Sequence, residues 1–143
     1  MINAEVSTVI NRPIAEVFAF FAEPTNNPKC EEGLIECRKI SPGPMGVGAQ
    51  IIEVRKFMGR QMESTLDVTA FETNKKYAVK VASGPIPFEL SAKFEAAGDG
   101  TKISVMGQGE PGGFFKLAEW LVKKQLQGQI EGDMGRLKKV LEG

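Results

Sequence analysis

The sequence predicts an α+β fold in which a curved antiparallel sheet wraps around a long C-terminal helix. Between residues 34 and 110, apolar and polar residues alternate in most segments, which is typical of antiparallel strands with one buried face. After Pro111-Gly112-Gly113 the apolar residues recur with a period of about 3.6, which predicts one continuous helix to the C-terminus.

The first thirty residues predict one strand followed by two short helices. Apolar residues alternate over residues 2–10, which predicts a half-buried strand. Pro13 is favoured at the first position of a helix, and the residues after it keep helical spacing up to Phe21. Pro24 ends that helix, and the segment 26–28 makes a second turn.

Six strands joined by tight turns are expected in the middle of the chain, because glycine, proline and asparagine cluster at the connections. The strands are expected over residues 34–41, 49–58, 61–71, 75–83, 87–96 and 101–110. The alternation places the following charged residues on the solvent face: Glu53, Arg55, Glu63, Asp67, Lys76, Lys80, Glu89 and Lys93. Carboxylates on that face would have no reason for a shifted pKa.

Composition limits the classes of function. The 143 residues match one ordinary domain over residues 1–143, and 42% hydrophobic residues suffice for a core. Eighteen basic and eighteen acidic residues cancel without a basic block, which argues against a nucleic-acid partner. The first residues lack the pattern of a signal peptide, and no apolar run approaches the roughly 18 residues of a membrane span. We therefore expect a cytoplasmic protein.

The two cysteines, Cys30 and Cys37, do not predict a metal site or a disulfide framework. Their spacing fits neither, and the chain has no histidine, the commonest metal ligand. We expect both thiols to be small buried apolar groups, and we expect no metal and no cofactor.

The apolar inward positions are more numerous than one helix stripe requires. They indicate either a packed core or a cavity for a small hydrophobic molecule. The residues expected to contact such a ligand are Phe18, Phe21, Ile52, Val54, Met62, Ser64, Leu66, Tyr77, Val79, Val81, Phe88, Leu90 and, on the core-facing stripe of the last helix, Val122.

No catalytic constellation is evident, because the usual general base, histidine, is absent. Tyr77, the only tyrosine, is a weak catalytic candidate, since its ring can line a cavity while its hydroxyl reaches a ligand atom. The alternative is that Tyr77 packs in the core. Ser64 is expected to supply at most a hydrogen bond, because no histidine can activate it.

Three glycines interrupt the predicted C-terminal helix, and each costs about 1 kcal/mol relative to alanine in a helix interior. Gly128, Gly132 and Gly135 lie on one side of the helix, opposite the core-facing stripe. One interpretation is a partner surface, most simply a homodimer contact, formed by Leu117, Trp120, Leu121, Gly128 and Gly132. The others are surface glycines that are merely tolerated, or a bend that lets the start of the helix act as a moving gate.

Three segments together carry a family resemblance. They are RPIAEVFAFFAEP after the first strand, GPMGVGAQIIEVRKFMGRQMESTLDVTAFE in the middle, and the closing DMGRLKKVLE. In order and spacing they resemble the START-like, or helix-grip, superfamily (SRPBCC), and within it the polyketide cyclase/dehydrase-type proteins. The resemblance covers nearly the whole chain. It implies a helix-grip fold with an apolar cavity between the sheet and the last helix.

One segment departs from that resemblance. Many relatives have a tryptophan in a segment resembling Asn-x-Pro-x-Trp, whereas this chain reads Asn26-Asn27-Pro28-Lys29-Cys30. The smaller Cys30 side chain is expected to widen the mouth or floor of the cavity.

Three hypotheses for the function follow. The leading one is binding of a small hydrophobic ligand, lipid-like or polyketide-like, without catalysis. An alternative from the resemblance is a polyketide cyclase/aromatase-like enzyme in which Tyr77 or a bound water moves protons. The third is an interaction module that acts through the outer face of the C-terminal helix.

Overall fold

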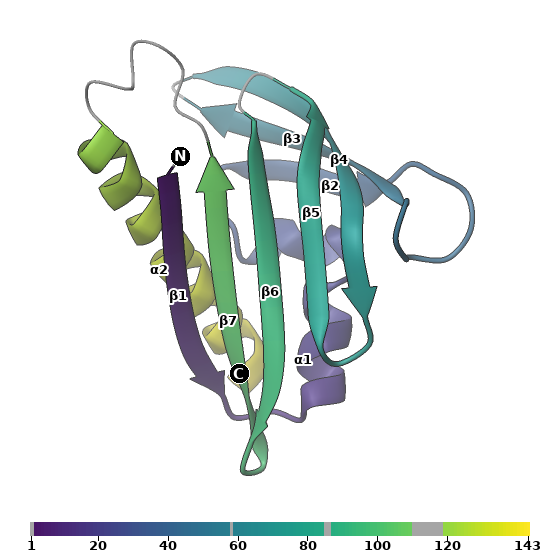
Figure 1. The fold of residues 1–143 in the computed structure, drawn as a ribbon, viewed down its shortest axis with the longest axis vertical. Helices are drawn as coiled ribbons and strands as arrows, with labels where there is room; N and C mark the ends of the chain where they lie inside the picture. The colour runs from purple at the N-terminus through teal and green to yellow at the C-terminus, as the bar shows by residue number, and fades with distance from the viewer. Residues whose placement is uncertain (1, 58, 85–86, 110–118) are drawn as a thin grey trace.

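One antiparallel sheet and a long C-terminal helix dominate the computed structural model, which describes residues 2–57, 59–84, 87–109 and 119–143 (Figure 1). The strands are β1 (Ile2–Ile10), β2 (Leu34–Lys39), β3 (Gln50–Phe57), β4 (Arg60–Glu72), β5 (Lys76–Ser83), β6 (Phe88–Ala97) and β7 (Gly100–Gly109). Helix α1 (Ile14–Phe21) and the 3-10 helix η1 (Pro24–Lys29) follow β1, and α2 (Glu119–Glu142) comes last. The predicted order of elements, including two short helices after the first strand, is confirmed.

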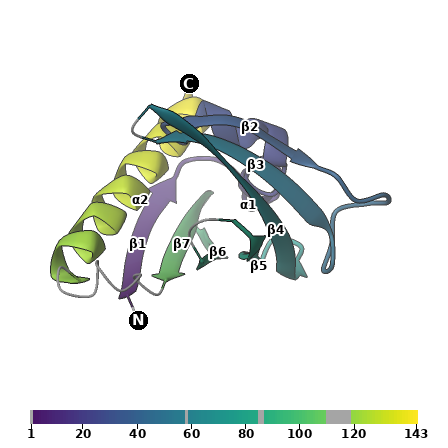
Figure 2. The same ribbon diagram turned by 90° about the horizontal axis from the view of Figure 1, so that it is seen from above.

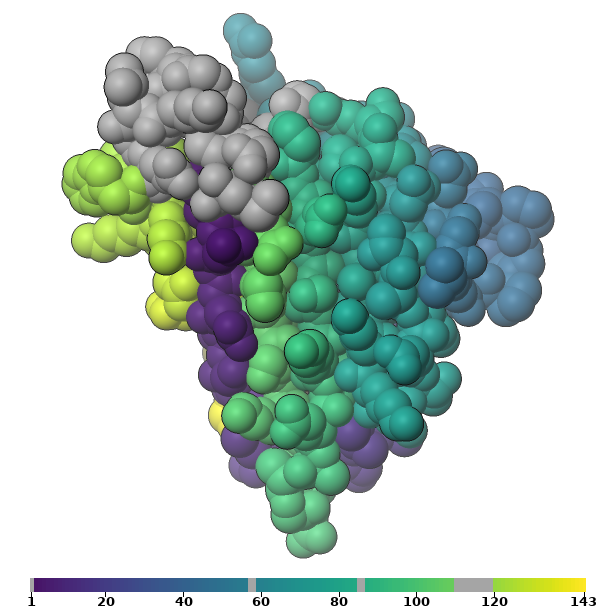
Figure 3. All heavy atoms as spheres, in the orientation of Figure 1, coloured from purple at the N-terminus to yellow at the C-terminus, as the bar shows by residue number. Residues whose placement is uncertain are grey.

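The seven strands pair in the order β1-β7-β6-β5-β4-β3-β2, so β1 and β2 form the edges of the sheet. Figure 2 shows that the sheet curls until its two halves face one another, and that α2 lies along the open side between β1 and β2. Figure 3 shows the outer face, where β1, β7 and β6 lie side by side. The predicted wrapping of a curved sheet around the last helix is confirmed. None of the helices in the described part of the chain is long and apolar enough to cross a membrane.

Helix α2 covers the free edge of β1 with side-chain hydrogen bonds. Gln127 Nε2 donates to the carbonyl of Glu5 at 2.9 Å, and Lys138 Nζ donates to the carbonyl of Val9 at 2.6 Å. An uncovered strand edge is a template for pairing with other chains. The helix therefore protects this edge as well as the concave face.

Five aromatic rings fill the end of the interior that lies next to α1. Phe18 and Phe21 of α1 meet Phe71, Tyr77 and Phe94 of β4, β5 and β6 in edge-to-face contacts, with ring centroids 5.1 to 6.1 Å apart. Such pairs contribute about 0.5–1.5 kcal/mol beyond the burial of their area. We call this group the aromatic cluster.

A β-bulge in β4 brings Phe71 into the aromatic cluster. Val68 pairs with Val79, but the next pair is Ala70 with Ala78, so β4 gains one residue over β5. Strict alternation would send Phe71, three positions after the buried Val68, to the outer face. The bulge restores its inward direction.

Strand β3 has the opposite phase from the one that the sequence predicted. Ile51 and Glu53 are buried, with 1% and 7% of their surface exposed, so Ile52 and Val54 alternate onto the outer face. The prediction that Ile52 and Val54 point inward is wrong, and so is the prediction that Glu53 and Arg55 face solvent. Because Ile51 and Ile52 are adjacent, the alternation of apolar and polar residues in this strand fits either phase, and the sequence could not distinguish between them.

Gly107 of β7 lets α2 approach the sheet closely. A Cβ at Gly107 would lie 3.0 Å from Cδ1 of Ile130 and 3.6 Å from Cδ2 of Leu126. Ile130, Met134 and Leu137 are buried, which confirms the predicted core-facing stripe at these positions.

Replacing Gly107 by valine should destabilise the protein by about 1–3 kcal/mol, because the added carbons overlap Ile130 and Leu126. Chemical denaturation followed by circular dichroism measures this loss. Met106→Val, on the outer face of the same strand, is the control and should change stability by less than about 0.5 kcal/mol. An equal loss in both variants would refute the close contact between β7 and α2.

Candidate functional site

The inner face of the sheet is mostly buried at the end next to α1, where Phe71 is half-buried, and is half-exposed at the other end. Next to α1, the inward side chains of Val17, Phe94 and Ile103 are buried. Toward the N-terminal end of α2, inward side chains of the same sheet and of the helix are only half-buried. These residues are Met62, Ser64, Val81, Phe88, Leu90, Val122 and Leu126, and we call them the open end. The open end is the candidate ligand site.

The residues predicted to contact a ligand divide into four groups. Phe18, Phe21 and Tyr77 belong to the aromatic cluster. Leu66 and Val79 are buried between that cluster and the open end. The open end contains Met62, Ser64, Val81, Phe88, Leu90 and Val122. Ile52 and Val54 lie on the outer face and do not join the others.

Tyr77 is surrounded by aromatic rings and is 4% exposed. Burial raises the pKa of its hydroxyl, and neighbouring acidic groups raise it further. A phenol with a raised pKa releases its proton less readily than a free tyrosine, so this environment disfavours Tyr77 as a general base.

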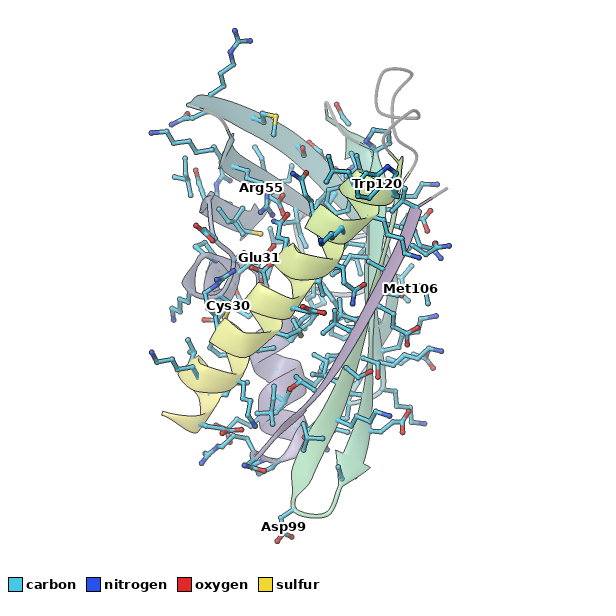
Figure 4. The ribbon with its side chains drawn as sticks, turned by 90° about the vertical axis from the view of Figure 1, so that its left-hand side faces the viewer. Cys30, Glu31, Arg55, Asp99, Met106 and Trp120 are labelled. Carbon is cyan, nitrogen blue, oxygen red and sulfur yellow. The ribbon has the colours of Figure 1, made fainter. Side chains whose placement is uncertain are left out.

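Glu31, Glu53 and Arg55 form an ion cluster on the inner side of β3, and the sequence analysis missed it. Arg55 Nη2 lies 3.0 Å from Oε1 of Glu31 and 3.0 Å from Oε1 of Glu53, and Arg55 Nε donates to the same oxygen of Glu53 at 3.2 Å. The Arg55 side chain is 19% exposed and that of Glu31 is 28% exposed. Figure 4 shows Arg55 and Glu31 on the same side of α2.

Gly33 brings Glu31 to this cluster. Its positive φ of 82° and a distance of 3.0 Å from a would-be Cβ to the carbonyl oxygen of Lys56 leave no room for a side chain. The backbone N–H of Lys56 donates to the carbonyl of Gly33 at 2.8 Å. The segment between η1 and β2 is thereby held against β3, beside Arg55.

Burial, with a smaller contribution from the charge of Glu53, raises the pKa of Glu31 to about 7 against the opposing charge of Arg55. Burial also raises the pKa of Asp133 on α2, against the opposing charge of Arg136. A carboxyl group with a pKa near 7 can accept or release a proton at physiological pH. Glu31 and Asp133 lie outside the strands, so the expectation for carboxylates on the solvent face of the sheet did not cover them.

Arg136 explains the glycine at position 132. Arg136 Nε donates to the carbonyl of Cys30 at 2.7 Å, and its Nη2 donates to Asp133, which is 8% exposed. A Cβ at Gly132 would lie 3.3 Å from Nη2 of Arg136. The missing side chain leaves room for the guanidinium group that ties α2 to the end of η1.

Both cysteines are buried, as predicted. Burial raises the pKa of Cys30 to about 11 and that of Cys37 to about 12. Their thiols are therefore protonated at neutral pH, and a protonated thiol is a poor nucleophile.

The outer side of α2 exposes two large apolar residues at the N-terminal end of the helix. Trp120 is 72% exposed and Leu121 is 43% exposed, and Figure 4 shows Trp120 at this end. Gly128 faces open space, with no atom within 4 Å of a would-be Cβ. Leu117, which was assigned to the same surface, lies outside the described residues.

A curved antiparallel sheet that grips a C-terminal helix, with an apolar interior open at one end, defines a helix-grip protein of the START-like type. The family model for polyketide cyclase / dehydrase and lipid transport matches residues 1–142. The chain therefore belongs to this family. A search of curated proteins finds no match.

Solved structures with low sequence identity share this fold. A START superfamily protein from Mycobacterium smegmatis superposes with a TM-score of 0.83 at 15% identity, over 99% of this chain and 98% of that chain. TTHA0849 from Thermus thermophilus gives 0.80 at 15% identity, over 96% and 94%. The di-domain ARO/CYC protein BexL from the BE-7585A biosynthetic pathway gives 0.79 at 14% identity, over 99% of this chain and 47% of that chain. These matches confirm the helix-grip fold.

The raised pKa of Glu31 predicts a pH-dependent stability. Because its pKa in the folded state, about 7, exceeds the ordinary value of 4.5, the folded state binds more protons between these values. The free energy of unfolding should therefore fall as pH rises from about 4.5 to 7. Glu31→Gln, which cannot ionise, should flatten that fall in urea titrations at a series of pH values.

Glu63→Gln, which removes an exposed carboxylate on β4, is the matched control and should keep the wild-type slope. Asp133, whose pKa is also raised by burial, adds a slope of the same sign. A wild-type protein whose stability rises steadily from pH 4.5 to 7 in parallel with Glu31→Gln would contradict the assignment.

Proposed function

We propose that residues 1–143 act as one ligand-binding domain that holds a small hydrophobic molecule, lipid-like or polyketide-like, between the sheet and α2, with no chemistry of its own. The observation that supports this proposal most directly is the open end, where apolar side chains face inward and yet remain half-exposed. An apolar ligand would remove these surfaces from water, which is the main source of affinity in such sites. The family description, which includes lipid transport, supports the same class of ligand.

The size of the ligand follows from the energy that binding requires. Each buried methylene contributes about 0.8 kcal/mol. A micromolar dissociation constant corresponds to about 8 kcal/mol, and association has its own entropic penalty. A ligand therefore needs on the order of ten or more buried carbons. Fatty acyl chains and fused-ring polyketides meet this requirement.

A cyclase-like enzyme is the second candidate, and one observation favours it. Glu31 is a carboxyl group with a pKa of about 7 beside the interior, which suits general acid or base catalysis better than Tyr77 does. The fold is shared with the ARO/CYC protein BexL. In this case Glu31→Gln would abolish turnover of a polyketide substrate, whereas a pure binding protein would lose no turnover.

Filling the open end should abolish binding. Val81→Trp places an indole among the half-buried residues of the open end and should leave the fold intact, because Val81 itself is only half-buried. Native mass spectrometry of protein purified from its own host should show a small molecule retained by the wild type and absent from Val81→Trp. Ile52→Trp, on the outer face, is the matched control and should retain the molecule.

The alternative outcomes would contradict the proposal directly. If the Val81→Trp variant retained the molecule, the binding site would lie elsewhere than at the open end. A wild-type chain that carries no small molecule and takes up no apolar fluorescent probe would refute ligand binding.

The exposed apolar residues of α2 also support a homodimer contact, in which Trp120 and Leu121 bury against a second copy and Gly128 permits a close approach of its backbone. Leu121→Asp should then shift sedimentation velocity from dimer toward monomer, because it places a charge in the contact. Val140→Asp, equally exposed at the other end of α2, is the control and should not shift it. A wild-type chain that sediments as a monomer at high concentration would rule the dimer out.

A further inference from the structure

The guanidinium group of Arg55 has one arm without an acceptor. Its Nε and Nη2 atoms are bound by Glu53 and Glu31. Its Nη1 atom is buried and has no hydrogen-bond partner among the described residues. A buried donor without an acceptor is unfavourable, and more so when it carries charge. Arg55 Nη1 is therefore a charged hydrogen-bond donor for which the described residues supply no acceptor.

Arg55, which carries this free arm, lies next to the open end in the strand register. Arg55 pairs directly with Met62 across β3 and β4, and Glu53 pairs with Ser64, so both polar residues share the inner face with members of the open end. Nη1 is closed to solvent in this structure, so an acceptor reaches it only when a neighbour moves. Met62 is half-buried, unbranched and adaptable, which makes such a movement easy.

The charges around Arg55 favour a neutral acceptor over an anion. One guanidinium group already faces two carboxylates, Glu31 and Glu53, and Asp133 of α2 adds negative charge that Arg136 balances. A carboxylate on the ligand would add a further buried negative charge to the two that Arg55 already faces. A carbonyl oxygen satisfies Nη1 without that penalty.

We propose that Arg55 Nη1 anchors the ligand through a neutral carbonyl oxygen, so that the molecule bound at the open end is an apolar ketone, aldehyde or ester. This assignment rests on the proposed function, because it names the polar group of the molecule that the open end holds. The apolar body contacts Val81, Phe88 and Leu90, while its carbonyl oxygen reaches past Met62 to Arg55.

Two matched fluorescent probes test the anchor. Prodan is a dimethylaminonaphthalene that carries a propionyl ketone, and its emission shifts to longer wavelength when the ketone accepts a hydrogen bond. The same naphthalene without the ketone is the apolar reference. Wild-type protein should bind prodan about tenfold more tightly than the reference, the advantage expected of one hydrogen bond to a charged donor. Its bound emission should show the shift to longer wavelength.

Arg55→Met should remove both the tenfold preference and the emission shift, while the reference probe keeps its affinity. Arg38→Met, which removes an exposed arginine of β2, is the matched control and should behave as wild type. Should Arg55→Met fail to fold, Arg55→Lys serves instead. Its single ammonium group remains paired with Glu31 and Glu53 but offers no second arm, so the ketone preference should again be lost.

The outcomes separate the anchor from the binding function. Equal affinity of wild-type protein for prodan and the reference would overturn the anchor and leave hydrophobic binding in place. Failure to bind either probe would overturn both. Tighter binding of the naphthalene that carries a carboxylate in place of the ketone would overturn the neutral carbonyl and assign an anionic ligand instead.

Discussion

The curvature of the sheet is the constraint on which the rest of the structure depends. A curled antiparallel sheet with two edges and one apolar concave face leaves a single open side, and α2 is the element that closes it. The helix can do so only because Gly107 lets Ile130 sit close to β7 and because Gln127 and Lys138 bind the edge of β1. Each of these contacts fixes the distance between helix and sheet, and that distance sets the space that remains inside.

The two ends of the interior differ in how completely their apolar side chains are buried, and under the proposed function they divide stability and ligand binding between them. The aromatic cluster around Phe18 and Phe94 brings large rings into mutual contact, so it stabilises the fold. The open end has inward apolar residues such as Val81 and Leu90 that remain half-exposed, so it lowers stability and leaves surface to be covered. Residues that look alike in sequence, such as Phe21 and Phe88, therefore have different roles according to the end at which they lie.

Local patterns determine the elements, and this is why the order of strands and helices could be predicted from turns and periodicity alone. The direction of a strand's side chains depends on tertiary packing when two apolar residues are adjacent, as Ile51 and Ile52 are. The position of Glu31 could not be predicted, because it lies in the connection between η1 and β2 and reaches Arg55 only through the turn at Gly33. The ion pair within β3 could have been predicted, because Glu53 and Arg55 have opposite charges and, two residues apart, share one face of the strand.

The ion cluster links the protonation of Glu31 to the occupancy of the interior. A ligand that covers the open end removes water from around Glu31, and loss of water favours the neutral form of a carboxyl group. A carbonyl oxygen that accepts a hydrogen bond from Nη1 would also weaken the interaction between Arg55 and Glu31. That interaction lowers the pKa of Glu31. Both effects raise that pKa further when the ligand binds. Since linkage is reciprocal, protonation of Glu31 strengthens the binding of a neutral ligand by the same factor. With the pKa of Glu31 raised to about 7, the affinity for the proposed neutral ligand is expected to fall as pH rises through this range.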